Sequence, residues 1–174
     1  MKEWWLRTAL VLQAPRAVFV ALRDDSPEAA SDRAEPVLLV VMLAGIALAL
    51  ASSAAKSYHG VTLPVLLFIG GGLTGAAAYF AFGGLLYFSA RALGSHGSFR
   101  RARHVLAFAA VPLALSLVAS PVGRDAFSWI IFAFVAWATV LLLIGVRAVH
   151  GWTWLRAAAA VAPPLAAAVL LLTL

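Results

Sequence analysis

Long uncharged segments alternate with short charged ones along this chain. Five segments contain no Asp, Glu, Lys or Arg, and each has at least 18 residues: 37–55, 61–90, 105–123, 126–146 and 157–174. At about 1.5 Å per residue, a helix of this length crosses a hydrocarbon core of roughly 30 Å. The pattern predicts an all-α membrane protein in which residues 37–174 form a bundle of five transmembrane helices.

Residues 1–36 are more polar and have a different pattern. Two short apolar faces, from Trp4 to Val11 and from Val18 to Leu22, are separated by Pro15 and flanked by basic side chains. Such segments are typical of amphipathic helices that lie in the membrane interface. We therefore expect an N-terminal interfacial helix, or two, with its tryptophans at the headgroups. An acidic polar linker should follow and lead to the first span.

The basic residues predict the orientation. Eleven of the thirteen Lys and Arg residues lie on one side of the membrane: before the first span, between the second and third spans, or beside the link between the fourth and fifth. Only Lys56 and Arg124 lie on the opposite side. Cytoplasmic loops of membrane proteins carry an excess of Lys and Arg. This places the N-terminus in the cytoplasm and the C-terminus outside. The composition is rich in Arg and Ala and poor in Lys, which is typical of a bacterial protein, so we expect the membrane to be the bacterial inner membrane. The net charge of +6 is spread over short loops, which favours anionic lipids over nucleic acid as the partner.

The acids are concentrated at the N-terminus. Six of the seven lie in residues 1–36, whose charges sum to −1, whereas residues 37–174 sum to +7. One interpretation places Asp24, Asp25 or Glu28 against the cluster of Arg100, Arg101 and Arg103. The alternative is that these charges are solvated independently, because exposed ion pairs are worth only about 0–1 kcal/mol.

Small residues predict where two spans pack. Gly71, Gly75 and Ala78 share one face of the second span. The first span has a matching row at Gly45, Ala49 and Ser53. Such ridges let helix backbones approach closely, either within one chain or between copies in a homo-oligomer. The second span is also too long for an average membrane, so it must tilt, project or break, with the glycines at 70–72 as the candidate break.

Two polar links of the predicted cytoplasmic side share a plan in which a hydroxyl and an aromatic residue precede Arg-Ala. We expect the hydroxyl residues to cap the third and fifth helices and the aromatic residues to anchor at the interface. Prolines inside the same spans should bend them. The residues at these helix starts and bends are Ser98, Phe99, Pro112, Thr153, Trp154, Pro163 and Pro164.

Chemistry for catalysis or coupled transport is sparse. None of the five segments contains an ionisable residue or a histidine, although ion-coupled carriers keep such a group within the bilayer. Three histidines, His96, His104 and His150, lie on the predicted cytoplasmic side. They could bind a metal or form hydrogen bonds at the membrane interface. Their spacing matches no compact metal-ligand pattern, which favours hydrogen bonding. We expect no cofactor, no metal site and no enzyme activity.

Three segments carry a resemblance to a known family. They read APRAVFVALRDDSPEAASDRAEP, GSFRRARHVLAFAAVPLALSLV and LLLIGVRAVHGWTWLRA. In order and spacing the chain resembles the Yip (Ypt/Rab-interacting protein) domain family in its compact prokaryotic form. The resemblance implies five spans, a cytoplasmic N-terminus and a protein that acts through interactions. Eukaryotic relatives are associated with Rab-type GTPases, vesicle traffic or the shaping of organelle membranes.

Together these patterns favour a non-enzymatic membrane scaffold or interaction protein, with a role in membrane organisation or a trafficking-like process. A passive pore or small-molecule permease is the main alternative, and lipid handling is a third. The partner would be an unidentified membrane or cytoplasmic protein, or anionic lipid. The residues expected to dock it are Arg100, Arg101, Arg103, Arg147 and Arg156.

Overall fold

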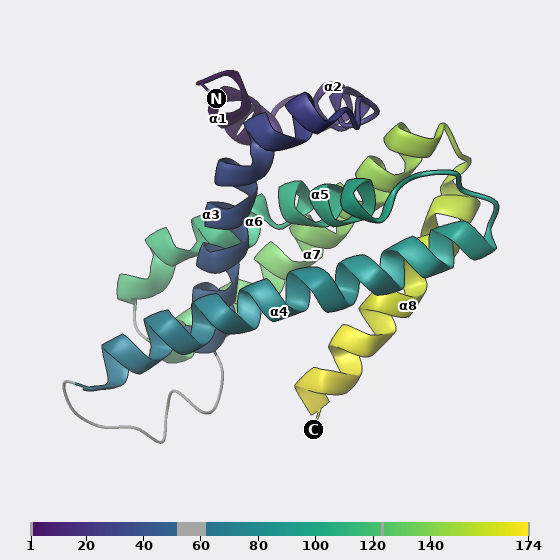
Figure 1. Cartoon of the computed structure of the whole chain (residues 1–174). Coiled ribbons are helices and arrows are strands. Elements are labelled where there is room, and N and C mark those ends of the chain that lie inside the picture. The colour runs from purple at the N-terminus through teal and green to yellow at the C-terminus, as the bar shows by residue number, and fades with distance from the viewer. Residues whose placement is uncertain (1, 52–61, 123, 174) are drawn as a thin grey trace.

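The computed structural model describes residues 2–51, 62–122 and 124–173, and all regular elements in these ranges are helical (Figure 1). They are α1 (Lys2–Leu10), α2 (Pro15–Ala21), α3 (Pro27–Ala51), α4 (Thr62–Ala92), α5 (Phe99–Ala109), α6 (Val111–Leu115), the 3₁₀ helix η2 (Ser116–Val122), α7 (Arg124–His150) and α8 (Trp154–Thr173). The prediction of an all-helical protein is confirmed.

Within the described part of the chain, four helical stretches are long and apolar enough to cross a membrane: Pro27–Ala51, Leu67–Ala92, Phe99–Pro121 and Ala126–His150. They contain most of the first four predicted spans. The fifth corresponds to α8, in which the apolar stretch Trp154–Leu170 is shorter. Positions 52–55, 61, 123 and 174 of the predicted spans lie outside the described residues.

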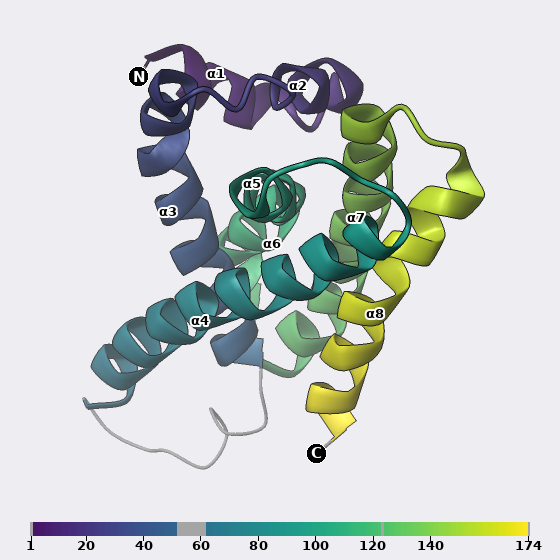
Figure 2. The same cartoon turned by 45° about the vertical axis from the view of Figure 1, so that its right-hand side comes forward.

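The helices surround α5 and α6. Helices α1 and α2 lie across the end of the bundle where α3 begins and α7 ends, and α4 crosses α3 and reaches α8 (Figure 2). We call the end that carries α1 and α2 the arginine face. It is defined by Arg16, Arg23, Arg100, Arg101, Arg147 and Arg156.

Helix α3 begins ten residues before the first predicted span. The Ser26 hydroxyl accepts a hydrogen bond from the Ala29 amide at 3.3 Å, Pro27 occupies the first turn and Glu28 follows it. These residues suit a helix start because they satisfy a free N–H group, fix the backbone and complement the helix dipole. The acidic linker is thus mostly helical, and α3 extends ten residues beyond the N-terminal end of the first predicted span.

The second predicted span is one continuous helix, whereas the third is divided into shorter helices. Helix α4 stays helical through the glycines at 70–72, so the candidate break is absent, and the long helix runs obliquely across the bundle (Figure 2). The third span is interrupted at Ala110, where α5 ends. Pro112 then lies in the first turn of α6, where its missing N–H group costs no intrahelical hydrogen bond.

The N-terminal helices pack on the protein more than predicted. Val11, Phe19 and Leu22 have no exposed surface, and the Trp4 ring lies 5.6 Å from the Phe108 ring, centroid to centroid. The prediction that these apolar faces lie in the membrane interface is wrong for the buried side chains. They join the main apolar core, because α2 packs against α7 and α1 against α3.

Helix α8 continues through Pro163 and Pro164. Because Pro164 has no N–H group, the carbonyl of Ala160, one turn earlier, loses its usual donor. The Ser89 hydroxyl of α4 donates a hydrogen bond to that carbonyl at 2.6 Å. A neighbouring helix therefore satisfies the group that the proline leaves free, as buried or membrane-embedded helices require.

Candidate functional site

The acidic N-terminal segment contacts the α5 arginines through Asp25. Arg100 Nε donates to Asp25 Oδ1 at 3.1 Å, and Arg100 Nη2 donates to the Asp25 carbonyl at 2.6 Å. The Ser98 hydroxyl donates to the other carboxylate oxygen. The predicted contact between this segment and the arginine cluster is thus confirmed, and the alternative of independent solvation is wrong for Asp25.

The pKa of Asp25 reflects opposing effects. Burial raises it, but the hydrogen bonds from Ser98 and Arg100 and the positive charges nearby outweigh burial and hold the pKa below its usual 3.8. Asp25 is therefore ionised at neutral pH. The pKa of Asp24 is lowered too, first by hydrogen bonds from Ser26.

Arg33 is the centre of a buried polar cluster that the sequence did not reveal. Its side chain has no exposed surface. Its Nε donates to His104 Nδ1 at 2.8 Å and its Nη1 to the Asp24 carbonyl at 2.9 Å, while Asp25 lies 3.5 Å from Nη2. The planar guanidinium serves three acceptors in different directions, which a single ammonium group could not match.

The two predicted helix caps are present. Ser98 Oγ accepts a hydrogen bond from the Arg101 amide at 3.0 Å, and Thr153 Oγ1 accepts one from the Arg156 amide at 3.5 Å. Phe99 and Trp154 follow the caps and are exposed. The first cap also places Arg100 and Arg101 in the first turn of α5, in the helix rather than in the preceding link.

The five arginines predicted to dock a partner divide into two groups. Arg100 and Arg101 contact the N-terminal segment, since Arg101 Nη2 donates to the Arg23 carbonyl at 2.8 Å. Arg103 lies among the rings of Tyr79, Phe80 and Phe99, 4.5–5.1 Å from their centroids. Arg147 and Arg156 are exposed. The α5 arginines thus mainly make contacts within the protein, and the exposed arginines of the five are Arg147 of α7 and Arg156 of α8.

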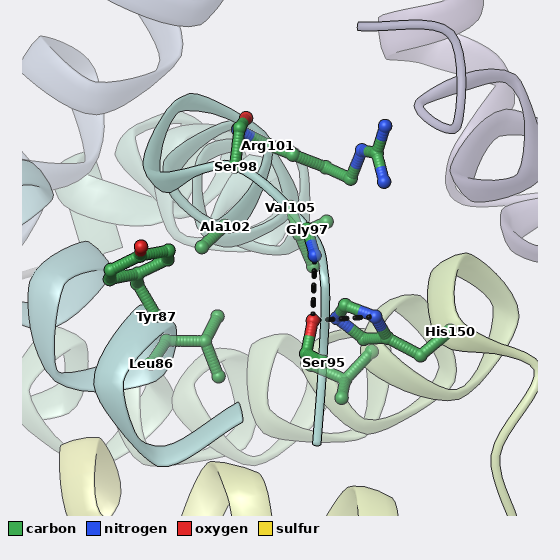
Figure 3. Close-up of a pocket in the computed structure, with 10 residues that line it drawn as sticks. Leu86, Tyr87, Ser95, Gly97, Ser98, Arg101, Ala102, Val105 and His150 are labelled. Atoms are coloured by element: carbon green, nitrogen blue, oxygen red, sulfur yellow. Dashed lines mark hydrogen bonds between the residues drawn. The ribbon is translucent and has the colours of Figure 1, made fainter. Parts of the chain in front are cut away.

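A small cavity lies between the α4–α5 link and the end of α7 (Figure 3). Ser95 Oγ is 3.2 Å from His150 Nδ1 and accepts a hydrogen bond from the Gly97 amide at 3.0 Å. The cavity volume is about 10 Å³, which holds a single water molecule. No carboxylate is among the described residues that line it, so the serine–histidine pair has neither an orienting acid there nor room for a substrate.

A larger groove opens between α2 and the end of α7. Its volume is about 390 Å³, and its lining residues are Arg16, Val20, Arg23, Ile144, Arg147, Ala148, Gly151 and Trp152. Three arginines thus line one groove, and none of its described lining residues is a carboxylate. The proximity of Arg16 to Arg147 depends on how α2 packs on α7, so the sequence alone does not group them.

The three histidines of the arginine face are not brought together. His104 is buried against Arg33, His150 lies against Ser95 and Trp152, and His96 is exposed. Among the described residues, no group of three His, Cys, Asp or Glu side chains has the arrangement of a metal site.

The small-residue ridges meet inside one chain. A Cβ atom built on Gly45 would lie 2.2 Å from the Gly71 carbonyl oxygen and 2.6 Å from Gly75 Cα. Backbones this close show that the two rows pack against each other within the chain, which is the first of the two interpretations. Ala78 is partly buried further along α4, whereas Ser53 of the matching row lies outside the described residues.

Comparison with known proteins identifies the family to which the chain belongs. A family model of the Yip1 domain matches residues 9–174, which include the end of α1 and every later helix. Searches among curated proteins and among solved structures give no match. The family match covers the α2–α7 groove, the Asp25 contacts and all four candidate membrane spans. The chain therefore belongs to the Yip1 domain family.

Proposed function

We propose that the protein is a non-enzymatic scaffold or interaction protein of the bacterial inner membrane, with five spans, a cytoplasmic N-terminus and an external C-terminus. In this arrangement α8 is the fifth span, because its 20 residues measure about 30 Å. The arginine face then lies at the cytoplasmic surface, in agreement with the positive-inside rule. The family match and the four apolar helices support this arrangement.

Helices α1 and α2 would lie at the cytoplasmic headgroups while packing on the bundle. Leu6 and Leu10 are 66% and 45% exposed, so α1 keeps an apolar edge after its other side is buried. Arg7, on the same helix, pairs with Glu3. An exposed apolar edge beside charged side chains suits the membrane interface.

The main support for the proposal is that the interior of the bundle is apolar and tightly packed, whereas positive charge is exposed at one end. One apolar core includes buried side chains from α1 to α8, and the close approach of Gly45 to Gly71 and Gly75 packs α3 tightly on α4. Exposed cationic groups, in contrast, gather at the arginine face. This supports docking at a surface, and it disfavours the passive pore, which requires a water-filled path through the bundle.

Docking would involve a cytoplasmic or membrane protein, or anionic lipid. Arg147 and Arg156 are the exposed members of the predicted set. They are held in place by aromatic rings, Arg147 over Trp154 at 4.3 Å and Arg156 over Trp152 at 4.5 Å. Such contacts orient a guanidinium without neutralising its charge.

Reconstitution in sealed liposomes tests this function against the permease. Potassium- and proton-sensitive dyes and glycerol-driven light scattering would report solute movement. We expect fluxes equal to those of protein-free vesicles, together with recovery of a cytoplasmic partner or bound anionic lipid when the full-length protein is purified in mild detergent. Saturable uptake of potassium, protons or glycerol, unchanged in R147E/R156E, would contradict the scaffold function.

A further inference from the structure

We infer that the groove between α2 and α7 binds the phosphate of an anionic phospholipid through Arg16, Arg23 and Arg147. The inference deepens the proposed function, and it rests on that function only for the position of the arginine face at the membrane surface. The groove is distinct from the Asp25 contacts, since its lining shares no residue with them.

The charges of the groove are fixed but not neutralised. Arg23 donates from Nε and Nη2 to the Ala148 carbonyl, at 3.1 and 2.6 Å. Arg147 lies over the Trp154 ring. Both partners are uncharged, and among the described residues neither arginine, nor Arg16, pairs with a carboxylate. Three positive charges therefore converge on one groove, where an anion would gain charge-assisted hydrogen bonds.

The walls of the groove suit a lipid better than a free anion. Val20 and Ile144 add apolar surface beside the arginines, and Val20 is 38% exposed. Trp152 forms another wall, and its ring contacts His150, at 4.5 Å between ring centroids, and the guanidinium of Arg156. A volume of about 390 Å³ exceeds what a bare phosphate fills and is typical of small-ligand sites.

The position of the groove along α7 agrees with a lipid headgroup. Arg147 lies in the last turn of the candidate span Ala126–His150, where a spanning helix emerges from the hydrocarbon core into the headgroup region. Basic pockets at this depth on the cytoplasmic side are suited to anionic headgroups. Ile144, one turn closer to the core, would contact the glycerol or the start of an acyl chain.

Native mass spectrometry of the full-length protein, titrated with phosphatidylglycerol in detergent, tests the inference. The variant R16Q/R147Q removes two charges that make no hydrogen bond within the described residues, and leaves Arg23 to hold Ala148. The matched control R7Q/R91Q removes two charges outside the groove. We expect phosphatidylglycerol affinity to fall at least about tenfold in R16Q/R147Q and to change less than about twofold in the control.

Competition identifies the ligand. We expect phosphatidylglycerol to remain bound in excess inorganic phosphate and to bind more tightly than phosphatidylcholine. Displacement by inorganic phosphate would show a free-anion site, and equal affinity for the two lipids would show no charge selection; either result overturns the inference. An equal loss of binding in R16Q/R147Q and R7Q/R91Q, or no loss in either, would overturn it too. Because lipid titration does not depend on solute flux, such a failure is distinguishable from a failure of the scaffold function.

Discussion

Arg33 Nε donates a hydrogen bond to His104 Nδ1 at 2.8 Å, and both side chains are buried. The contact joins the first part of α3 to the middle of α5 across 71 positions of the chain. It requires the histidine tautomer that carries its proton on Nε2, because Nδ1 accepts. Through Asp24 and Asp25, the same guanidinium also holds the segment that connects α2 to α3.

We expect R33M to lower the free energy of unfolding by about 3 kcal/mol, the usual cost of removing one member of a buried charged cluster. H104L alone should also destabilise, since it leaves the Nε donor of Arg33 without an acceptor while the contacts with Asp24 and Asp25 remain. The double variant R33M/H104L should cost less than the sum of the single variants, because they lose a shared hydrogen bond. Thermal unfolding in detergent would measure all three, and additive costs would show that the two residues are not coupled.

Gly45→Ala should destabilise the packing of α3 on α4. The new methyl group would lie 2.2 Å from the Gly71 carbonyl oxygen. Its nearest neighbours are backbone atoms of α4, so relieving the clash requires one helix to shift away from the other. Gly70→Ala is the matched control, since nothing lies within 4 Å of a Cβ at that position. The control should unfold at the same temperature as the parent or a higher one, because alanine favours the helix. If G45A melted like G70A, the close approach would be absent in the protein.

Ser89→Ala should cost about 1 kcal/mol of stability, because it removes the hydroxyl that donates to the Ala160 carbonyl. In a P164A background the same change should cost almost nothing, since the restored amide of residue 164 can donate to that carbonyl. Unfolding temperatures of the four proteins give the coupling. An equal cost of S89A in both backgrounds would mean that the serine does not compensate for the proline.

The Asp25 contacts predict a pH dependence. Because the folded-state pKa of Asp25 lies below 3.8, ionisation of this group stabilises the folded protein above the unfolded-state pKa, and that stability is lost as the pH falls through the lower folded-state value. The parent should melt at a higher temperature than D25N at pH 7, and the difference should shrink below about pH 4. A difference that stayed constant down to pH 2 would show that the ionisation of Asp25 is not its cause.

The sequence predicted those features that depend on local patterns. Uncharged length identified the apolar helices, and the hydroxyl residues Ser98 and Thr153 marked two helix starts correctly. The charge imbalance between the two parts of the chain pointed to the contact that Asp25 makes with Arg100. In each case a few neighbouring residues, or a sum of charges, contain the information.

Features that depend on packing between distant helices were not predictable in this way. Nothing in its local sequence distinguishes buried Arg33 from exposed Arg16, and both were counted simply as positive charges beside a membrane. The apolar side chains of α2 suit either lipid or protein, and only the packing of α2 on α7 shows that Phe19 is in the core. That same packing creates the groove, so its three arginines could not be grouped from the sequence.

Reporter fusions in living cells test the central claim most directly. A reporter placed after Leu174 should be active outside the cytoplasm, and one inserted between Gly94 and Gly97, in the link between α4 and α5, should be active only inside. This result would place the arginine face at the cytoplasmic surface, with α8 as a fifth span. A cytoplasmic C-terminus together with a cytoplasmic α4–α5 link would contradict the five-span arrangement.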